Sequence, residues 1–114
     1  MSIKEYNKLT FQEKLALIRF YSEEAKNDEY WLIRREAYKT LGFTKEAFKD
    51  EDADIRLEAY RALGFTQEAK KDENYSIKSE AYEILGYTEE ALNDKDDDIR
   101  KEAKIYLDFI KLNK

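Results

Sequence analysis

The sequence repeats itself with a period of 22 residues, and this repeat limits the possible folds more than any other feature. Three copies follow one another without gaps, at residues 25–46, 47–68 and 69–90, and a fourth begins at residue 91. Several positions of the repeat keep one residue type in every copy. Among them are Asp28, Asp50, Asp72 and Asp94; Ile33, Ile55, Ile77 and Ile99; Ala37, Ala59, Ala81 and Ala103; Leu41, Leu63, Leu85 and Leu107. A period of this length predicts a repeat protein in which each copy forms one small structural unit.

Each copy predicts an α-helix of roughly twelve residues that ends at a glycine. In residues 52–63, the spacing of Ile55, Ala59 and Leu63 by four places them on one apolar stripe. Asp52 stands where an N-cap residue belongs, as do Asn74 and Asp96 in the later copies. All three glycines of the chain, Gly42, Gly64 and Gly86, occupy one position. We expect them to end the helices in a Schellman-type turn with a positive φ angle.

A second, shorter helix is expected after each glycine. Thr44, Thr66 and Thr88 follow at the same position of the repeat and are good N-cap residues. Each predicts a helix of about six residues. Neither helix of a copy buries its apolar side alone, so neighbouring copies are expected to stack.

The predicted fold is therefore all-α: a short right-handed α-solenoid of 22-residue two-helix repeats with N-terminal and C-terminal capping helices. We expect one domain over residues 1–114. Residues 1–24 form an N-terminal cap unit in which Phe20 replaces the corner glycine. Residues 91–114 hold the last repeat, in which Asp108 replaces the glycine, and a C-terminal capping helix.

The conserved positions also resemble a known family. The string Lys49-Asp50-x-Asp52-x-x-Ile55-Arg56-x-x-Ala59-x-x-x-Leu63-Gly64 resembles the core of a HEAT repeat. The short period is closer to the leucine-rich variant repeat, which alternates an α-helix with a short 3₁₀-like helix. The resemblance covers roughly residues 22–107 and leaves both families open. It implies a scaffold or binding surface, and it implies that Asp and Arg at positions such as Asp50 and Arg56 form a ladder between copies.

The residue types most used in catalysis and metal binding are missing, because the sequence has no histidine and no cysteine. We therefore predict no enzyme activity, no catalytic residues, no metal and no cofactor. Residues 94–98 place Asp at the first, third and fifth positions of an EF-hand loop. Ile99 and Ile105 then stand where that loop needs Gly and Glu, so N-capping explains these acids better.

The net charge of −5 argues against direct binding of nucleic acid, which relies on clustered Lys and Arg. The acidic charge lies in the middle of the chain, since residues 47–68 and residues 69–90 each carry six acids and three bases. This distribution supports an alternative function. The chain would be a small acidic inhibitor, for example a phage-type anti-defence protein, that blocks the nucleic-acid-binding site of a partner protein.

Large apolar residues at variable positions of the repeat are the candidate binding residues, because the scaffold does not need them. They are Tyr30, Trp31, Phe48, Tyr75 and Leu92. Trp and Tyr are favoured anchors of protein interfaces. The main functional prediction is a non-enzymatic interaction module that binds a protein or peptide. Packing of Trp31 against the N-terminal cap is the other interpretation of that residue. The tyrosines at positions 38, 60 and 82 are expected to pack between copies.

No apolar run is long enough for a membrane span or a signal peptide, so we expect a cytoplasmic protein without membrane association. Ile105, Tyr106, Phe109 and Ile110 lie in the predicted capping helix. They would either seal the end of the stack or support a dimer, so we expect a monomer or a weak homodimer through this helix.

Overall fold

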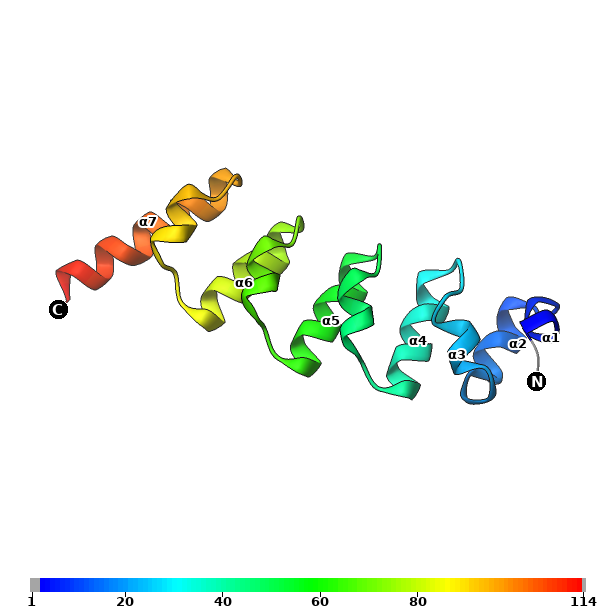
Figure 1. Cartoon of the computed structure of the whole chain (residues 1–114). Helices are drawn as coiled ribbons and strands as arrows, with labels where there is room; N and C mark the ends of the chain where they lie inside the picture. Colours follow the sequence, from blue (N-terminus) through cyan, green and yellow to red (C-terminus); the bar gives the residue numbers. More distant parts are fainter. Residues whose placement is uncertain (1–2, 114) are drawn as a thin grey trace. The chain divides into compact units, whose positions relative to one another are not determined.

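The structure of residues 3–113 is a computed structural model, and it confirms the all-α prediction because this range contains no β-strand (Figure 1). The chain divides into two compact units, Met1–Leu63 and Gly64–Lys114, called unit 1 and unit 2 below. The division falls inside the repeat at residues 47–68. The single solenoid domain remains a prediction. No helix in the described part of the chain combines the length and apolar character that a membrane crossing requires.

Each unit alternates α-helices with shorter helical turns. Unit 1 contains α1 (Ile3–Asn7), α2 (Phe11–Ala16), η1 (Ile18–Phe20), α3 (Ser22–Ala25), α4 (Trp31–Leu41), η2 (Lys45–Lys49) and α5 (Ala53–Leu63). Unit 2 contains η3 (Gln67–Lys71), α6 (Tyr75–Leu85), η4 (Glu89–Asn93) and α7 (Asp97–Leu112). The η elements are 3₁₀ helices, and η2, η3 and η4 each pack on the α-helix that follows.

The α-helices begin where the capping residues predict. Asp52 accepts hydrogen bonds from the backbone N–H of Asp54 at 2.9 Å and of Ile55 at 3.3 Å. Asn74 and Asp96 cap α6 and α7 in the same way. These side chains satisfy backbone donors that have no partner inside the first turn. The helices α4, α5 and α6 are each 11 residues long, close to the predicted twelve.

The prediction that threonine side chains cap the short helices is wrong. Thr44, Thr66 and Thr88 do occupy the N-cap positions, but their side chains make no capping hydrogen bond. Each element is a five-residue 3₁₀ helix, whose bonds join residues three apart. The carbonyl of the threonine itself therefore takes the first bond, as in the 3.0 Å contact from Ala47 N–H to Thr44.

The glycine corners have the predicted positive φ but not the predicted turn. The φ angles of Gly42, Gly64 and Gly86 are 87°, 98° and 91°. The ψ angles of Gly42 and Gly86 are 140° and 139°, far from the left-handed helical region that a Schellman ending uses. The backbone here is extended with positive φ, a conformation that is essentially restricted to glycine.

The core consists of the short side chains of the repeat. The conserved isoleucines and alanines of α4 to α7 are fully buried, and so is the alanine of each short helix at Ala47, Ala69 and Ala91. The predicted leucine stripe is partly wrong, because Leu41, Leu63 and Leu85 are 39%, 48% and 38% exposed. A spacing of four advances about 40° around a helix with 3.6 residues per turn. Two such steps after the isoleucine turn the leucine away from the buried face.

Aromatic rings complete the core next to the corners. Tyr38 and Tyr82 are 4% and 1% exposed, and their rings stack on Phe43 and Tyr87 with centroids 6.0 and 5.3 Å apart. These ring contacts lie within one copy, but Tyr38 also belongs to one buried cluster with Ile55 and Ala59 of the next copy, as the prediction of packing between copies requires. Burial raises the pKa of the Tyr82 hydroxyl above its ordinary value.

Candidate partner-binding site

A ladder of aspartates and bases holds the copies of the repeat in place. Each ladder aspartate first binds its own loop, because one carboxylate oxygen accepts the backbone N–H two residues further on. These bonds are 2.9 Å long for Asp28 to Tyr30, Asp50 to Asp52, Asp72 to Asn74 and Asp94 to Asp96. Within each unit, one of these aspartates also binds a base from the preceding copy. Asp50 binds Arg34 in unit 1, and Asp94 binds Lys78 at 2.8 Å in unit 2.

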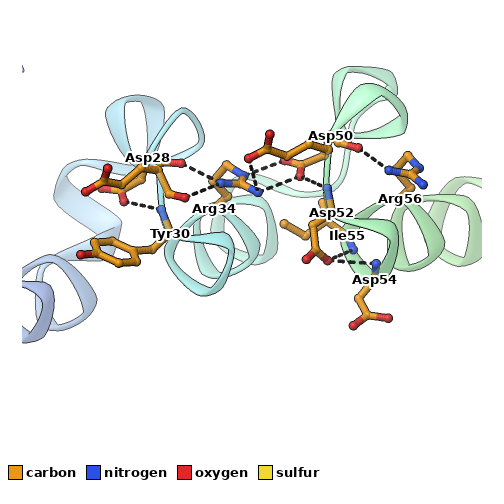
Figure 2. A network of polar contacts seen from close by, with 10 residues as sticks. Asp28, Tyr30, Arg34, Asp50, Asp52, Asp54, Ile55 and Arg56 are labelled. Carbon is orange, nitrogen blue, oxygen red and sulfur yellow. Dashed lines mark hydrogen bonds and ion pairs between the residues drawn. The ribbon is translucent and has the colours of Figure 1, made fainter.

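The ladder bases also satisfy backbone carbonyls (Figure 2). Nη1 of Arg34 donates to the carbonyls of Asp28 and Glu29 at 2.9 and 3.0 Å. Arg56 donates to the carbonyl of Asp50 at 2.8 Å. The N-terminal cap unit has Gln12 at this position, and Lys14 binds Asp28 at 2.9 Å instead. The ladder that the family resemblance implied is thus present within each unit, and its acids are structural.

The ladder contacts shift the pKa values of the buried carboxylates. Burial alone raises the pKa of Asp28, but hydrogen bonds from Lys14 and Tyr6 outweigh it and hold that pKa below its ordinary value. In unit 2, burial opposes the hydrogen bonds from Lys78 and the Asp96 backbone, and the pKa of Asp94 is again lowered. Both carboxylates are therefore charged at neutral pH.

Two of the predicted binding residues stand together at the start of α4. Tyr30 is the N-cap residue of this helix and Trp31 is its first residue. They are 50% and 46% exposed. The ring of Tyr30 meets Phe11 edge to face, with centroids 5.6 Å apart. Trp31 is not part of the buried core, so filling of the core does not explain it.

Phe48 is not an exposed binding residue. It lies half-buried in η2, and its ring stacks on Tyr60 with centroids 4.3 Å apart. It also packs against the buried cluster that contains Tyr38 and Ile55. The sequence pattern could not separate this role from binding, because a variable position is packed or exposed according to how the short helix sits on α5.

The other two predicted residues lie in unit 2. Tyr75 begins α6 and is 37% exposed, and its hydroxyl donates to Glu102 on α7. Glu102 also accepts from the hydroxyl of Tyr87 at 2.7 Å. Burial, together with this bond, raises the pKa of Tyr87. Leu92 in η4 is 36% exposed. Tyr75 therefore combines an exposed ring with an anchored hydroxyl group.

The C-terminal half of α7 exposes a larger apolar face than any of the binding residues predicted from the sequence. Ile105, Phe109 and Leu112 are 72%, 61% and 85% exposed, and Tyr106 and Ile110 are each 40% exposed. Tyr106 also contacts Tyr87, with ring centroids 5.3 Å apart. Only the start of the helix is buried, at Ile99 and Ala103.

Two surface grooves were missed by the sequence reasoning. The first groove, of about 480 Å³ in unit 1, lies over Arg34 and Tyr38 and beside the end of η2; we call it the acidic groove. The second, of about 460 Å³ in unit 2, lies over Lys78 and Tyr82 and beside η4; we call it the basic groove. The two grooves occupy the same positions of the repeat, two copies apart. A comparison of charged residues at the variable positions would have indicated the difference in charge between these copies, but not the grooves themselves.

Among residues 3–113, no group of three or more acidic side chains is arranged to hold a metal ion. Comparisons with protein-family models, curated proteins and solved structures found no match.

Proposed function

We propose that the chain is a non-enzymatic interaction module that binds a protein or peptide. The observation that carries this proposal is the exposed pair Tyr30 and Trp31 at the start of α4. Exposed aromatic rings of this kind are costly to leave in water and are enriched at the energetic centres of interfaces. Tyr75 and Leu92 supply further exposed apolar surface in unit 2.

The architectural part of the proposal is a right-handed α-solenoid related to HEAT-like or leucine-rich variant repeats. Its support is the recurrence of one α-helix and one 3₁₀ helix per copy, with a ladder contact between successive copies inside each unit. We also propose that the protein works in the cytoplasm. Small-angle X-ray scattering tests the architecture, because a stacked solenoid gives a more elongated distance distribution than a compact globule of equal mass.

A pull-down from cell extract, followed by mass spectrometry, tests the binding surface. We expect Tyr30→Ala/Trp31→Ala to lose partners that the wild type retains. Ile84→Ala is the matched control, since Ile84 is 59% exposed but belongs to no predicted site. Phe48→Ala is unsuitable because its ring packs on Tyr60. Recovery of the same partners in the same amounts by the double variant would remove this surface from the proposal.

The alternative, an acidic inhibitor of a nucleic-acid-binding protein, is less well supported. Asp50 and Asp52, two of the central acids, already bind Arg34 and the first turn of α5. Only the outward acids remain for a partner, among them Glu51, Asp54 and Glu73. Replacing these three with lysine should abolish inhibition of the partner and leave the helix content unchanged. Unchanged inhibition would exclude this alternative.

We further propose that the exposed face of α7 pairs weakly with the same face of a second copy. Its five exposed apolar side chains lie on one helix and are too few to bury a large interface. A closed two-fold contact would cover the patch on both copies at once. The expected state is therefore a monomer that forms a weak homodimer at high concentration.

A further inference from the structure

The acidic and basic grooves have the same backbone setting but opposite charge. Three cationic and five anionic side chains line the acidic groove, whereas four lysines and two acids line the basic groove. The lining residues thus carry a net −2 in unit 1 and +2 in unit 2. Asn27 corresponds to Lys71 and Glu51 to Lys95, whereas Lys49 corresponds to Asn93. The counterparts of Asp28 and Glu29 in unit 2 are acids too, but they do not line the basic groove.

The contacts of one lysine, Lys26 or its counterpart Lys70, also differ between the two grooves. In the acidic groove, Nζ of Lys26 lies 3.1 Å from Glu23 and 3.0 Å from Glu46, so two carboxylates bind it. In the basic groove the corresponding Lys70 has a side chain that is only 3% exposed. Gln67, an uncharged amide, stands at the position of Glu23.

The ammonium group of Lys70 lies near one carboxylate and one aromatic ring. Its Nζ lies 3.9 Å from Oε2 of Glu90 and 5.0 Å from the centre of the Tyr82 ring. At 3.9 Å the Glu90 contact is too long for a hydrogen bond. Lys78, by contrast, is bound directly by Asp94 at 2.8 Å. A carboxylate that enters from the groove would therefore meet weaker competition from the protein's own acids at Lys70 than at Lys26.

We propose that the basic groove binds a carboxylate side chain of an acidic peptide segment. Lys70 would receive the carboxylate at the base, and the exposed Lys71 and Lys95 would attract it from the rim. The volume of about 460 Å³ suits one or two side chains. A short peptide fits better than a nucleic acid, because an extended polyanion would meet the net charge of −5 of the whole chain. This assignment rests on the proposed function as a binding module.

Fluorescence anisotropy with the full chain tests the assignment. The probe is a fluorescein-labelled octapeptide of alternating Glu and Gly, and the same peptide with Gln in place of Glu is its control. Lys71→Glu/Lys95→Glu should weaken binding of the Glu peptide by about tenfold or more. Lys45→Glu/Lys101→Glu makes the same change in net charge at exposed lysines outside both grooves, and should weaken binding by less than about twofold.

A reciprocal variant tests whether charge alone determines which of the two grooves binds the peptide. Asn27→Lys/Glu51→Lys gives the acidic groove the lysines of the basic groove, and titration calorimetry should then find a second bound peptide per chain. Equal losses in the groove variant and its charge-matched control would overturn the proposal. Tighter binding of a fluorescein-labelled oligothymidine than of the peptide would also overturn it.

The outcome of the pull-down that tests the proposed function is independent of the outcome of the peptide-binding test. A partner that is lost with Tyr30→Ala/Trp31→Ala and kept with Lys71→Glu/Lys95→Glu would uphold the binding module and reject the basic groove as its contact. Specific peptide binding at the basic groove, without any partner lost on removal of the aromatic pair, would uphold the groove and reject the aromatic surface.

Discussion

Arg34 binds the carboxylate of Asp50 with two nitrogens at once. Nε lies 3.0 Å from Oδ2, and Nη2 lies 3.1 Å from Oδ1. The two side chains are 8% and 5% exposed, so water has little access to the pair. Since Nη1 of the same residue also binds the loop at Asp28 and Glu29, one guanidinium group joins two consecutive copies of the repeat in unit 1.

Removing this guanidinium should destabilise the fold strongly. We expect Arg34→Ala to lower the free energy of unfolding by about 3–5 kcal/mol, because Asp50 stays buried without its partner. Urea denaturation followed by circular dichroism measures the loss. The double variant Arg34→Ala/Asp50→Ala should lose less than the sum of the single variants.

An exposed pair provides the control for this prediction. Lys104 and Asp108 on α7 are 3.3 Å apart, with side chains 73% and 53% exposed. Lys104→Ala should change the free energy of unfolding by about 1 kcal/mol or less. If Arg34→Ala has no larger effect than Lys104→Ala, the ladder does not stabilise the stack.

Acid should weaken the ladder only at low pH, because its carboxylates hold their charge longer than ordinary ones as the pH falls. The pKa of Asp94 in the folded state lies below its ordinary value of 3.8. A carboxylate of this kind stabilises the fold fully above its unfolded pKa, and the stabilisation is lost as the pH falls through the folded pKa. The melting temperature should therefore decrease once the pH falls below about 4. Asp94→Asn should differ most from the wild type at neutral pH, and the difference should shrink on acidification; a constant difference would contradict the assignment.

Replacement of a corner glycine should destabilise the fold through backbone strain alone. A Cβ built on Gly86 meets no atom within 4 Å, but its φ is 91° and its ψ is 139°. Gly86→Ala should therefore cost about 1–3 kcal/mol in the free energy of unfolding. Gly86→Asn should be no better, since asparagine favours only the left-handed helical region. Urea denaturation followed by circular dichroism measures both variants; rescue by asparagine would indicate a Schellman ending after all.

Replacement of Trp31 and replacement of Phe48 should have different effects on the free energy of unfolding. Trp31→Ala removes a ring that is 46% exposed, and it should change the free energy of unfolding by about 1 kcal/mol or less. Phe48→Ala removes a ring that stacks on Tyr60, and it should cost about 2–4 kcal/mol. Chemical denaturation of both variants gives the comparison. Equal losses would mean that Trp31 also serves packing.

Self-association should depend on the exposed face of α7. Sedimentation velocity should find a monomer at low micromolar concentration and a growing dimer fraction at much higher concentration. Phe109→Glu should remove the dimer without loss of helix content, because Phe109 is 61% exposed. Ile84→Glu is the matched control on α6, since Ile84 is 59% exposed. Loss of the dimer with both variants would place the contact elsewhere.

Much of the local structure was predictable from the repeat. The N-caps at Asp52, Asn74 and Asp96 and the corners at Gly42 and Gly86 depend on residues a few positions apart. Comparison of aligned copies reveals such short-range preferences directly. The errors at Thr44 and its equivalents concern one hydroxyl group, whose bonding depends on whether the short helix is α or 3₁₀.

The candidate site was less predictable. Aligned copies correctly indicated Trp31 and Tyr75 as variable residues with exposed rings, but Phe48 has the same sequence signature and is packed. The basic groove brings Lys71, Lys78 and Lys95 together from a short helix, an α-helix and a loop. No spacing within one helix could indicate that grouping.

The sequence by itself determined the 22-residue period, the helical class, the helix starts and corners, and the isoleucines and alanines of the core. These features follow from residue preferences that act over a few positions and recur in register. Only the tertiary structure decided which variable side chains are covered, which leucines turn outward and where the two grooves lie. Those outcomes depend on how each 3₁₀ helix packs on the next α-helix, and packing of that kind is set by the whole unit.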